Sequence, residues 1–302
     1  MRSLKATSGR YLVPGIAGFS AFFIVSLVIV LITIIGYNGF PHISWRFLTT
    51  APSDGMTGGG IFPAIVGTFF LVILMSLFGV PVGTITAVYL SEFVTQDSKV
   101  VRTIRFAVNT LAGIPSIVFG LFGLGFFVQF VGSGMDKVLG HGEVIRWSQP
   151  NILWSSLTMA LLTLPVVIVA VEEAIRSVPR DLREASLALG ATRLETIFKV
   201  VLPGCSTGIL TGTILAISRG SGEVAPILFT GAAYFLPHLP SSLSDQFMNL
   251  GYHIYIMSTQ STNVDATKGI QYATTFVLLS LTFLFNIVAM WVRYKMRKKV
   301  IR

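Results

Sequence analysis

Charged residues are scarce in this sequence. Asp, Glu, Lys and Arg make up 12% of its 302 residues, about half of the roughly 25% that a typical soluble domain carries. Apolar residues make up 53%, and many lie in runs of about 20 residues, the length that a helix needs to cross a bilayer. The composition therefore excludes an ordinary soluble domain and indicates an all-α integral membrane protein.

Cysteine pairs and nucleotide-binding motifs are also absent. Cys205 is the single cysteine, so no internal disulfide can form, and a buried free thiol is expected. The phosphate-binding sequence G-x4-G-K-[ST] occurs nowhere, and the glycines at 58–60 lack the following Lys, so they predict a flexible loop. ATP hydrolysis coupled to this chain would need another polypeptide. We identify no catalytic, metal-binding or cofactor-binding residues.

The positive charge lies where membrane proteins concentrate it. The net charge of +9 comes largely from bases at the two ends of the chain and in short loops. The positive-inside rule places such ends in the cytoplasm, so we expect both termini there. Membrane lipid headgroups, rather than nucleic acid, are the expected partners of the basic stretch 293–302.

The apolar runs predict about six membrane-spanning helices in a single domain, residues 1–302. We expect the fourth span to be broken near Pro165. Residues 224–268 are either re-entrant or external, because Pro226 and Gly231 interrupt their apolar part. The expected spans are about Gly15–Tyr37, Phe62–Leu90, Phe106–Val131, Ile152–Val171, a helix that begins at Pro203, and Ile270–Val292.

One strongly charged segment, Glu172–Pro203, lies between two apolar runs and predicts two short amphipathic helices that meet at an elbow. Gly190 ends the first helix, because glycine accepts the left-handed geometry of a C-cap. Thr192 and Glu195 begin the second helix with the T-x-x-E pattern of a capping box. An elbow of this kind at a membrane face is suited to dock into a groove on a soluble partner.

The spacing in this segment resembles the EAA loop of ABC-importer permeases, E-A-A-x3-G-x9-I-x-L-P. Ser186 and Val200 stand where the pattern has alanine and isoleucine. The resemblance implies the type I (MetI-like) permease architecture, in which residues 172–203 form a cytoplasmic coupling loop on a separate ATPase. The simpler interpretation is a solvated loop in which glycine only turns the chain. The residues expected to couple the chain to the ATPase are Glu184, Ala185, Ser186, Gly190, Leu202 and Pro203.

Small residues recur at every fourth position of the fifth expected span. Such a stripe lets another helix pack at close range. The simpler interpretation is the ordinary enrichment of glycine in membrane helices. The residues of the stripe are Gly204, Gly208, Gly212, Ala216 and Gly220.

Two charged residues, Arg219 and Glu223, follow at the far end of the same span. If the helix continues, they are i,i+4 neighbours and can form an ion pair. Charged residues inside a membrane usually face a cavity or a partner. A guanidinium can donate two parallel hydrogen bonds to one oxyanion. Arg219 is therefore a candidate contact for an oxyanion substrate. The alternative is an ion pair that anchors the helix at the membrane interface.

Two stretches narrow the resemblance to the PstA family of bacterial phosphate permeases. Residues 219–230, RGSGEVAPILFT, resemble the family signature R-x-x-G-E-T-A-P-L-L-F-T, with Val224 in place of threonine. Residues 113–120, GIPSIVFG, resemble a second family segment. The resemblance implies a multi-pass subunit of the bacterial cytoplasmic membrane. In it, Arg219 would guide phosphate, and Glu223 would hold Arg219 in orientation or act as its gate partner when no anion is present. The implied partners are a sister permease (PstC-like), an ATPase pair (PstB-like), an external phosphate-binding protein (PstS-like) and inorganic phosphate itself.

Three other functions remain compatible with these residues. The first is an ABC importer for a different oxyanion, such as sulfate or molybdate. The second is a secondary transporter or channel that works without an ATPase, which would have no need of the elbow. The third is a membrane scaffold, in which replacement of Arg219 would leave uptake unchanged.

Overall fold

The computed structural model of the chain describes residues 3–53, 56–94, 98–139, 145–261 and 264–300. The terminal residues 1–2 and 301–302, which belong to the basic ends, lie outside this part. Within it, the prediction of an all-α membrane protein is confirmed, because six helical stretches have the length and apolar composition to cross a bilayer. They are Pro14–His42, Phe62–Phe93, Ser116–Leu139, Ile152–Ser177, Arg193–Gly220 and Val264–Arg297.

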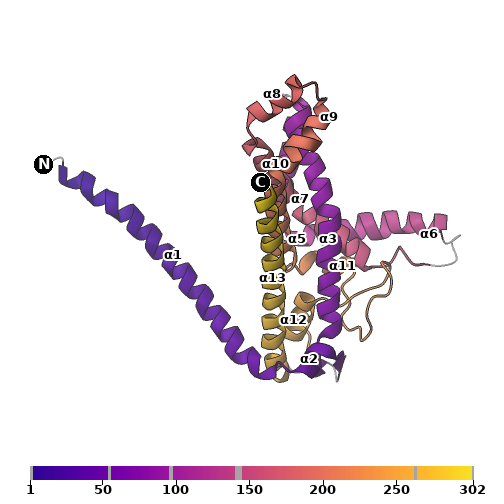
Figure 1. The fold of residues 1–302 in the computed structure, drawn as a ribbon. Coiled ribbons are helices and arrows are strands. Elements are labelled where there is room, and N and C mark those ends of the chain that lie inside the picture. The colour runs from indigo at the N-terminus through magenta and orange to yellow at the C-terminus, as the bar shows by residue number, and fades with distance from the viewer. Residues whose placement is uncertain (1–2, 54–55, 95–97, 140–144, 262–263, 301–302) are drawn as a thin grey trace.

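The first helix, α1 (Ser3–Gly39), extends away from the rest of the molecule (Figure 1). It meets the last helix, α13 (Val264–Val300), near its own C-terminal end, where a Cβ on Gly36 would lie 3.7 Å from the ring of Phe276. None of the most apolar window of α1 is buried within the chain. Lipid or another subunit must therefore cover this helix.

A short connection follows α1 and leads into the second span. It contains η1 (Phe40–His42), α2 (Trp45–Thr49) and a two-stranded antiparallel hairpin of β1 (Pro52–Ser53) and β2 (Gly58–Gly59). Gly59 has a φ of +78°, a backbone conformation that favours glycine. The prediction of a flexible loop at these glycines is therefore wrong, since two of them are paired in a strand.

Three helices form the centre of the molecule: α3 (Phe62–Val88), α7 (Ile152–Ser177) and α10 (Leu202–Gly220). The most apolar window of α7 is 67% buried, the largest share among the six spans described. Glycines let α3 approach α7 closely, since a Cβ on Gly83 would lie 2.6 Å from Val167. The sequence therefore places its most buried helix between two neighbours that it contacts through small residues.

The glycine stripe of α10 faces α7 at Gly208 and Gly212, whereas Gly220 at its end packs against Met75 of α3. A Cβ on Gly212 would lie 3.2 Å from the Cβ of Ala170, and one on Gly208 would overlap the Cβ of Ala174. At Gly204 there is more room, because the nearest atom would be Val178 Cγ2 at 3.4 Å. The stripe thus contacts a helix of the same chain, at a separation that larger side chains would not allow.

The difference in space along the stripe predicts different effects of alanine at two positions. Gly208→Ala should lower the free energy of unfolding by about 1–3 kcal/mol, because the added methyl forces α10 away from α7. Gly204→Ala, its matched control, should be tolerated. Thermal unfolding of both variants in detergent measures the effect, and equal melting temperatures would show that the contact with Ala174 is unimportant.

The third span differs from its prediction. A single helix over Phe106–Val131 was expected, but the chain breaks at Ile114 and Pro115, which have ψ values of 133° and 139°. The cause is local, because proline disfavours helical geometry in the residue before it. The pieces are the amphipathic helix α4 (Lys99–Gly113), then α5 (Ser116–Gly123), the π-helical η4 (Leu124–Gly132) and α6 (Ser133–Leu139).

Two other prolines do not break their helices. α7 runs without interruption through Pro165, which is buried, so the predicted break there is wrong. The fifth span does not begin at Pro203, because α9 (Arg193–Thr196) leads through a π-helical turn, η5 (Ile197–Val201), directly into α10. A π-helical turn changes the hydrogen-bond register of a helix, and here it lies just before the residue that lacks an N–H.

The segment between the fifth and sixth spans is partly buried. α11 (Ala225–Thr230) packs against α5 and α7, with Ile227 and Thr230 fully buried. The chain then passes through irregular structure to α12 (Leu250–Thr259), which packs against α13. Among the described residues, the apolar first part is thus packed inside the fold as a short helix.

Candidate functional site

The charged segment forms the predicted elbow at one end of the molecule. α8 (Arg180–Ala188) and α9 lie together at the top of Figure 1. Gly190 has a φ of +90°, and its N–H donates to Leu187 O at 3.0 Å while Ala191 N donates to Ser186 O at 3.2 Å. These two bonds form a Schellman motif, so the predicted glycine C-cap is confirmed.

A capping box and a pair of hydroxyl groups fix the C-terminal side of the elbow. Thr192 Oγ1 accepts from Glu195 N at 3.2 Å, and Glu195 Oε2 accepts from Thr192 N at 2.9 Å, which confirms the predicted capping box. Ser186 and Thr196 place their hydroxyl oxygens 3.0 Å apart across the elbow. The serine that departs from the family pattern thus links α8 to the start of the fifth span.

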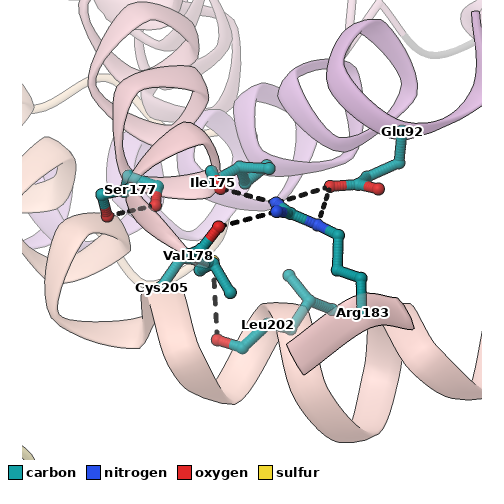
Figure 2. A network of polar contacts seen from close by, with 8 residues as sticks. Glu92, Ile175, Ser177, Val178, Arg183, Leu202 and Cys205 are labelled. Atoms are coloured by element: carbon teal, nitrogen blue, oxygen red, sulfur yellow. Dashed lines mark hydrogen bonds and ion pairs between the residues drawn. The ribbon is translucent and has the colours of Figure 1, made fainter. Parts of the chain in front are cut away.

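Arg183 joins the elbow to the membrane helices. Figure 2 shows its guanidinium between α7 and the end of the second span. Nη1 donates to Val178 O and Nη2 to Ile175 O, both at 2.7 Å, while Nε donates to Glu92 Oε1 at 3.2 Å. The two carbonyl groups belong to the C-terminal end of α7, where helical partners run out and a cation is favourable. We call these contacts the Arg183 clamp.

Glu92 holds the other side of the Arg183 clamp. It lies in η3 (Tyr89–Phe93), the π-helical end of the second span, and its Oε1 is 3.0 Å from Arg183 Nη2. The two side chains are 19% and 17% exposed. A second ion pair nearby, Arg105 Nη2 to Glu172 Oε1 at 3.5 Å, joins α4 to α7. The elbow is therefore attached to the ends of two spans beside α4.

Some of the expected ATPase-coupling residues are exposed, and others pack against the rest of the chain. Glu184, Ala185 and Gly190 are exposed, and Leu189 is 90% exposed. Exposed apolar side chains on a polar elbow mark an interaction surface. Leu202 packs against the core instead, and Pro203 lies in the first turn of α10. The other exposed apolar side chains on or directly after the elbow are Leu182 and Leu187 in α8, Leu194 in α9 and Phe198 in η5.

The elbow is shorter than the segment 172–203. Residues 172–177 form the last turns of α7, and residues 193–203 belong to the continuous fifth span. Charge alone suggested the longer segment, because Glu172 and Arg176 lie on α7. The connection that turns the chain is therefore Val178–Thr192, which contains α8 and the Gly190 turn.

Arg219 and Glu223 lie at the other end of the fifth span. Arg219 Nε is 3.9 Å from Glu223 Oε1, and the side chains are 35% and 25% exposed. The ion pair forms although the helix does not continue to Glu223, because α10 ends at Gly220. At this distance the contact is not a hydrogen bond. Within the described residues the Arg219 guanidinium therefore keeps its donors free.

The end of α10 is held on two sides. Ser218 Oγ donates to Asn286 Oδ1 at 2.7 Å, and Thr282 Oγ1 donates to Ser221 Oγ at 3.2 Å, which attach it to α13. On the opposite side, a Cβ on Gly220 would overlap Met75 of α3. These contacts position the backbone that carries Arg219.

The two stretches that carry the phosphate-permease resemblance lie against each other. A Cβ on Gly120, the last residue of the first stretch, would lie 2.9 Å from Ala225 O and 3.1 Å from Pro226 Cα in the second. Gly120 of the first pattern and Pro226 of the second thus lie at the contact between α5 and α11. The two stretches are about a hundred residues apart in the sequence, and the fold brings them into contact.

Sequence patterns did not identify the two side chains of the Arg183 clamp. Arg183 lies in α8, and Glu92 lies at the end of the second span. They are 91 positions apart in the chain, so no local pattern links them. Only their positions could have drawn attention to them. Glu92 lies at the end of an apolar span, and Arg183 directly precedes Glu184 of the EAA-like pattern.

The family model for the binding-protein-dependent transport system inner membrane component matches residues 79–301. The chain is 33% identical to the probable ABC transporter permease protein YqgI of Bacillus subtilis (strain 168), over 96% of both chains. It is also 33% identical to the phosphate transport system permease protein PstA of Mycobacterium leprae (strain TN), over 70% of this chain and 65% of that protein.

A solved structure has a similar fold. It is that of a bacterial alginate ABC transporter in complex with a pentasaccharide-bound periplasmic protein, and it matches with a TM-score of 0.63 over 99% of this chain and 98% of that one. The sequence identity is 17%. This likeness shows the fold, and the expected type I permease architecture is confirmed.

Proposed function

Because this chain belongs to the family of binding-protein-dependent transport system inner membrane components and is a permease subunit of an ABC importer, we propose that its substrate is inorganic phosphate. The observation that supports this proposal is the arrangement of side chains at the end of the fifth span. There, Arg219 has a guanidinium with no hydrogen bond to the described residues, beside Glu223 and a packed pair of phosphate-permease stretches. Relatives that carry the phosphate permease name support it.

The chemistry of Arg219 suits a tetrahedral oxyanion. A guanidinium presents parallel N–H donors that can bind two oxygens of one phosphate. Glu223, 3.9 Å away, would hold the arginine when no anion is present and would be displaced when one arrives. The charge of the carboxylate would also keep the anion from binding too tightly to leave.

The proposed assembly needs other subunits, because a permease subunit is not an enzyme. We propose a sister permease, two ATPase subunits that hydrolyse ATP, and an external phosphate-binding protein. The chain would lie in the cytoplasmic membrane of a bacterium with both termini and the elbow in the cytoplasm, as its terminal bases predict. The exposed residues Glu184, Ala185 and Leu189 would then contact the ATPase.

Coupling would follow from the rigid attachment of the elbow. ATP binding would close the ATPase pair and move α8. The Arg183 clamp would pass this movement to α7 and to the end of the second span, because its contacts hold three elements together. The glycine contacts between α7 and α10 would carry it to the helix end that bears Arg219.

The substrate is tested by uptake into cells or vesicles that contain the complete transporter. Uptake of labelled phosphate should be reduced by unlabelled phosphate and unaffected by an equal excess of sulfate or molybdate. Transport of sulfate without transport of phosphate would contradict the proposed substrate and leave the permease architecture intact.

Replacing Arg219 with lysine separates two-point anion contact from simple charge. Arg219→Lys keeps the charge and removes the parallel N–H donors of the guanidinium. Phosphate uptake should therefore fall at least tenfold, which corresponds to a free-energy difference of about 1.4 kcal/mol or more. Arg293→Lys, on α13 near the C-terminal end, is a matched control and should transport normally. Unchanged uptake in Arg219→Lys would make Arg219 an anchor of the helix.

A further inference from the structure

A cavity beside the elbow has the residues of an anion site. Its volume is about 720 Å³, and it lies between the end of the second span, α4, the last turn of α7 and α8. Four arginines and two glutamates line it, which leaves an excess of positive charge. The lining residues used here are Ser91, Glu92, Arg105, Arg176, Arg180 and Arg183.

The cavity contains more hydrogen-bond donors than the described residues satisfy. The Arg105 Nε and Ser91 Oγ atoms are buried and have no partner. Arg176 and Arg180 form no hydrogen bond or ion pair with the described part of the chain. Arg183, by contrast, donates a hydrogen bond from each of its three guanidinium nitrogens, to Glu92 and to two carbonyl groups (Figure 2). Buried donors without partners are rare in folded proteins, so an excess of them points to a missing acceptor.

We propose that this cavity binds the phosphate group of an anion, which accepts hydrogen bonds from Arg176 and Arg180 and, deeper in the cavity wall, from Arg105 and Ser91. Guanidinium groups and hydroxyls are the side chains that bind phosphate oxygens most readily. The anion is either free inorganic phosphate or the headgroup of an anionic phospholipid. The site goes beyond the proposed function, and uses it only to place the cavity on the cytoplasmic side.

Occupancy of the cavity would connect the elbow to its surroundings. Arg180 belongs to α8, Arg176 to α7 and Arg105 to α4. An anion that contacts all three would join the elbow to two neighbouring helices at a point beside the Arg183 clamp. The site is separate from the end of the fifth span, because Arg219 does not line this cavity.

The experiment compares two double variants of the full-length chain, both in an Arg219→Gln background that removes the proposed substrate contact. The test variant is Arg176→Gln with Arg180→Gln. The control, Arg102→Gln with Arg193→Gln, removes the same charge from two exposed arginines outside the cavity. Binding of labelled inorganic phosphate is measured by equilibrium dialysis in uncharged detergent, and retained phosphatidylglycerol is counted by native mass spectrometry.

We expect the control to bind like its parent, and the test variant to bind at least one of the two probes about tenfold more weakly. Loss of phosphate binding identifies the free anion as the ligand, and loss of retained lipid identifies the headgroup. Equal binding by both variants, or no binding of either probe by the parent, would overturn the proposal. If the test variant melts at a lower temperature without anion, Arg180→Lys, which keeps the charge, should still weaken binding. Failure here leaves the uptake results unaffected, so the two proposals are tested independently.

Discussion

Replacing Arg183 with glutamine is expected to lower phosphate uptake about a hundredfold while the chain still inserts into the membrane. The change removes two hydrogen bonds to the end of α7 and the ion pair with Glu92. The carboxylate and both carbonyl groups then lose their partner in a site that is less than one-fifth exposed. Leaving a largely buried charge unpaired costs about 3 kcal/mol, which is a large fraction of the free energy of unfolding of a typical protein.

The elbow should suffer most from this loss, because few other contacts hold it. α8 has no fully buried residue, so the Arg183 clamp is its main polar attachment to α7 and to the second span. We expect the variant complex to hydrolyse ATP without importing phosphate, a loss of uptake of about a hundredfold. Uptake and ATP hydrolysis measured on the same vesicles would show this separation.

Two further variants separate the loss of the Arg183 clamp contacts from the loss of a positive charge. Arg193→Gln removes an exposed arginine of α9, directly after the elbow, and should transport normally. Glu92→Gln should weaken uptake, and combining it with Arg183→Gln should add little, because both variants break the same contact. Additive losses from the two changes, or normal coupling in Arg183→Gln, would show that the elbow transmits movement by another route.

Gly190→Val is expected to release the ATPase from the purified complex. The φ of +90° at Gly190 is strained for any residue with a Cβ and most of all for a β-branched one. A Cβ at this position would meet no atom within 4 Å, so the penalty comes from the backbone and not from a clash. The strain, about 1–3 kcal/mol, should open the Schellman turn and misdirect α8 relative to α9.

Asparagine at the same position provides the matched control. Asn tolerates positive φ better than other residues with a side chain, so Gly190→Asn should retain most of the ATPase. Both variants should reach the membrane in normal amounts. Normal co-purification of the ATPase with Gly190→Val would mean that the elbow angle is unimportant for docking.

Local signals in the sequence predicted the elbow well. The Gly190 turn and the Thr192–Glu195 box depend on residues three to five positions apart, and the structure contains both as expected. The glycine stripe also depends only on helical spacing, although its partner, α7, could not be known from spacing alone. Features of this kind are encoded in short stretches and therefore need no knowledge of tertiary contacts.

Proline shows where local signals fail. Pro115 separates two helices, Pro165 lies within a continuous one, and Pro203 follows a π-helical turn near the start of α10. The same residue gives three results because burial and packing decide whether a missing hydrogen bond is tolerated. The Arg183 clamp was missed for a similar reason, since Glu92 comes from a different span.

The most direct measurement of the central claim is ATP hydrolysis by the complete transporter in vesicles, with its binding protein supplied loaded or empty. We expect phosphate-loaded binding protein to stimulate hydrolysis and sulfate not to replace phosphate. In Arg183→Gln, the stimulated hydrolysis should continue without uptake. Phosphate uptake that continues without any ATPase, or hydrolysis that is the same with and without phosphate, would contradict this expectation.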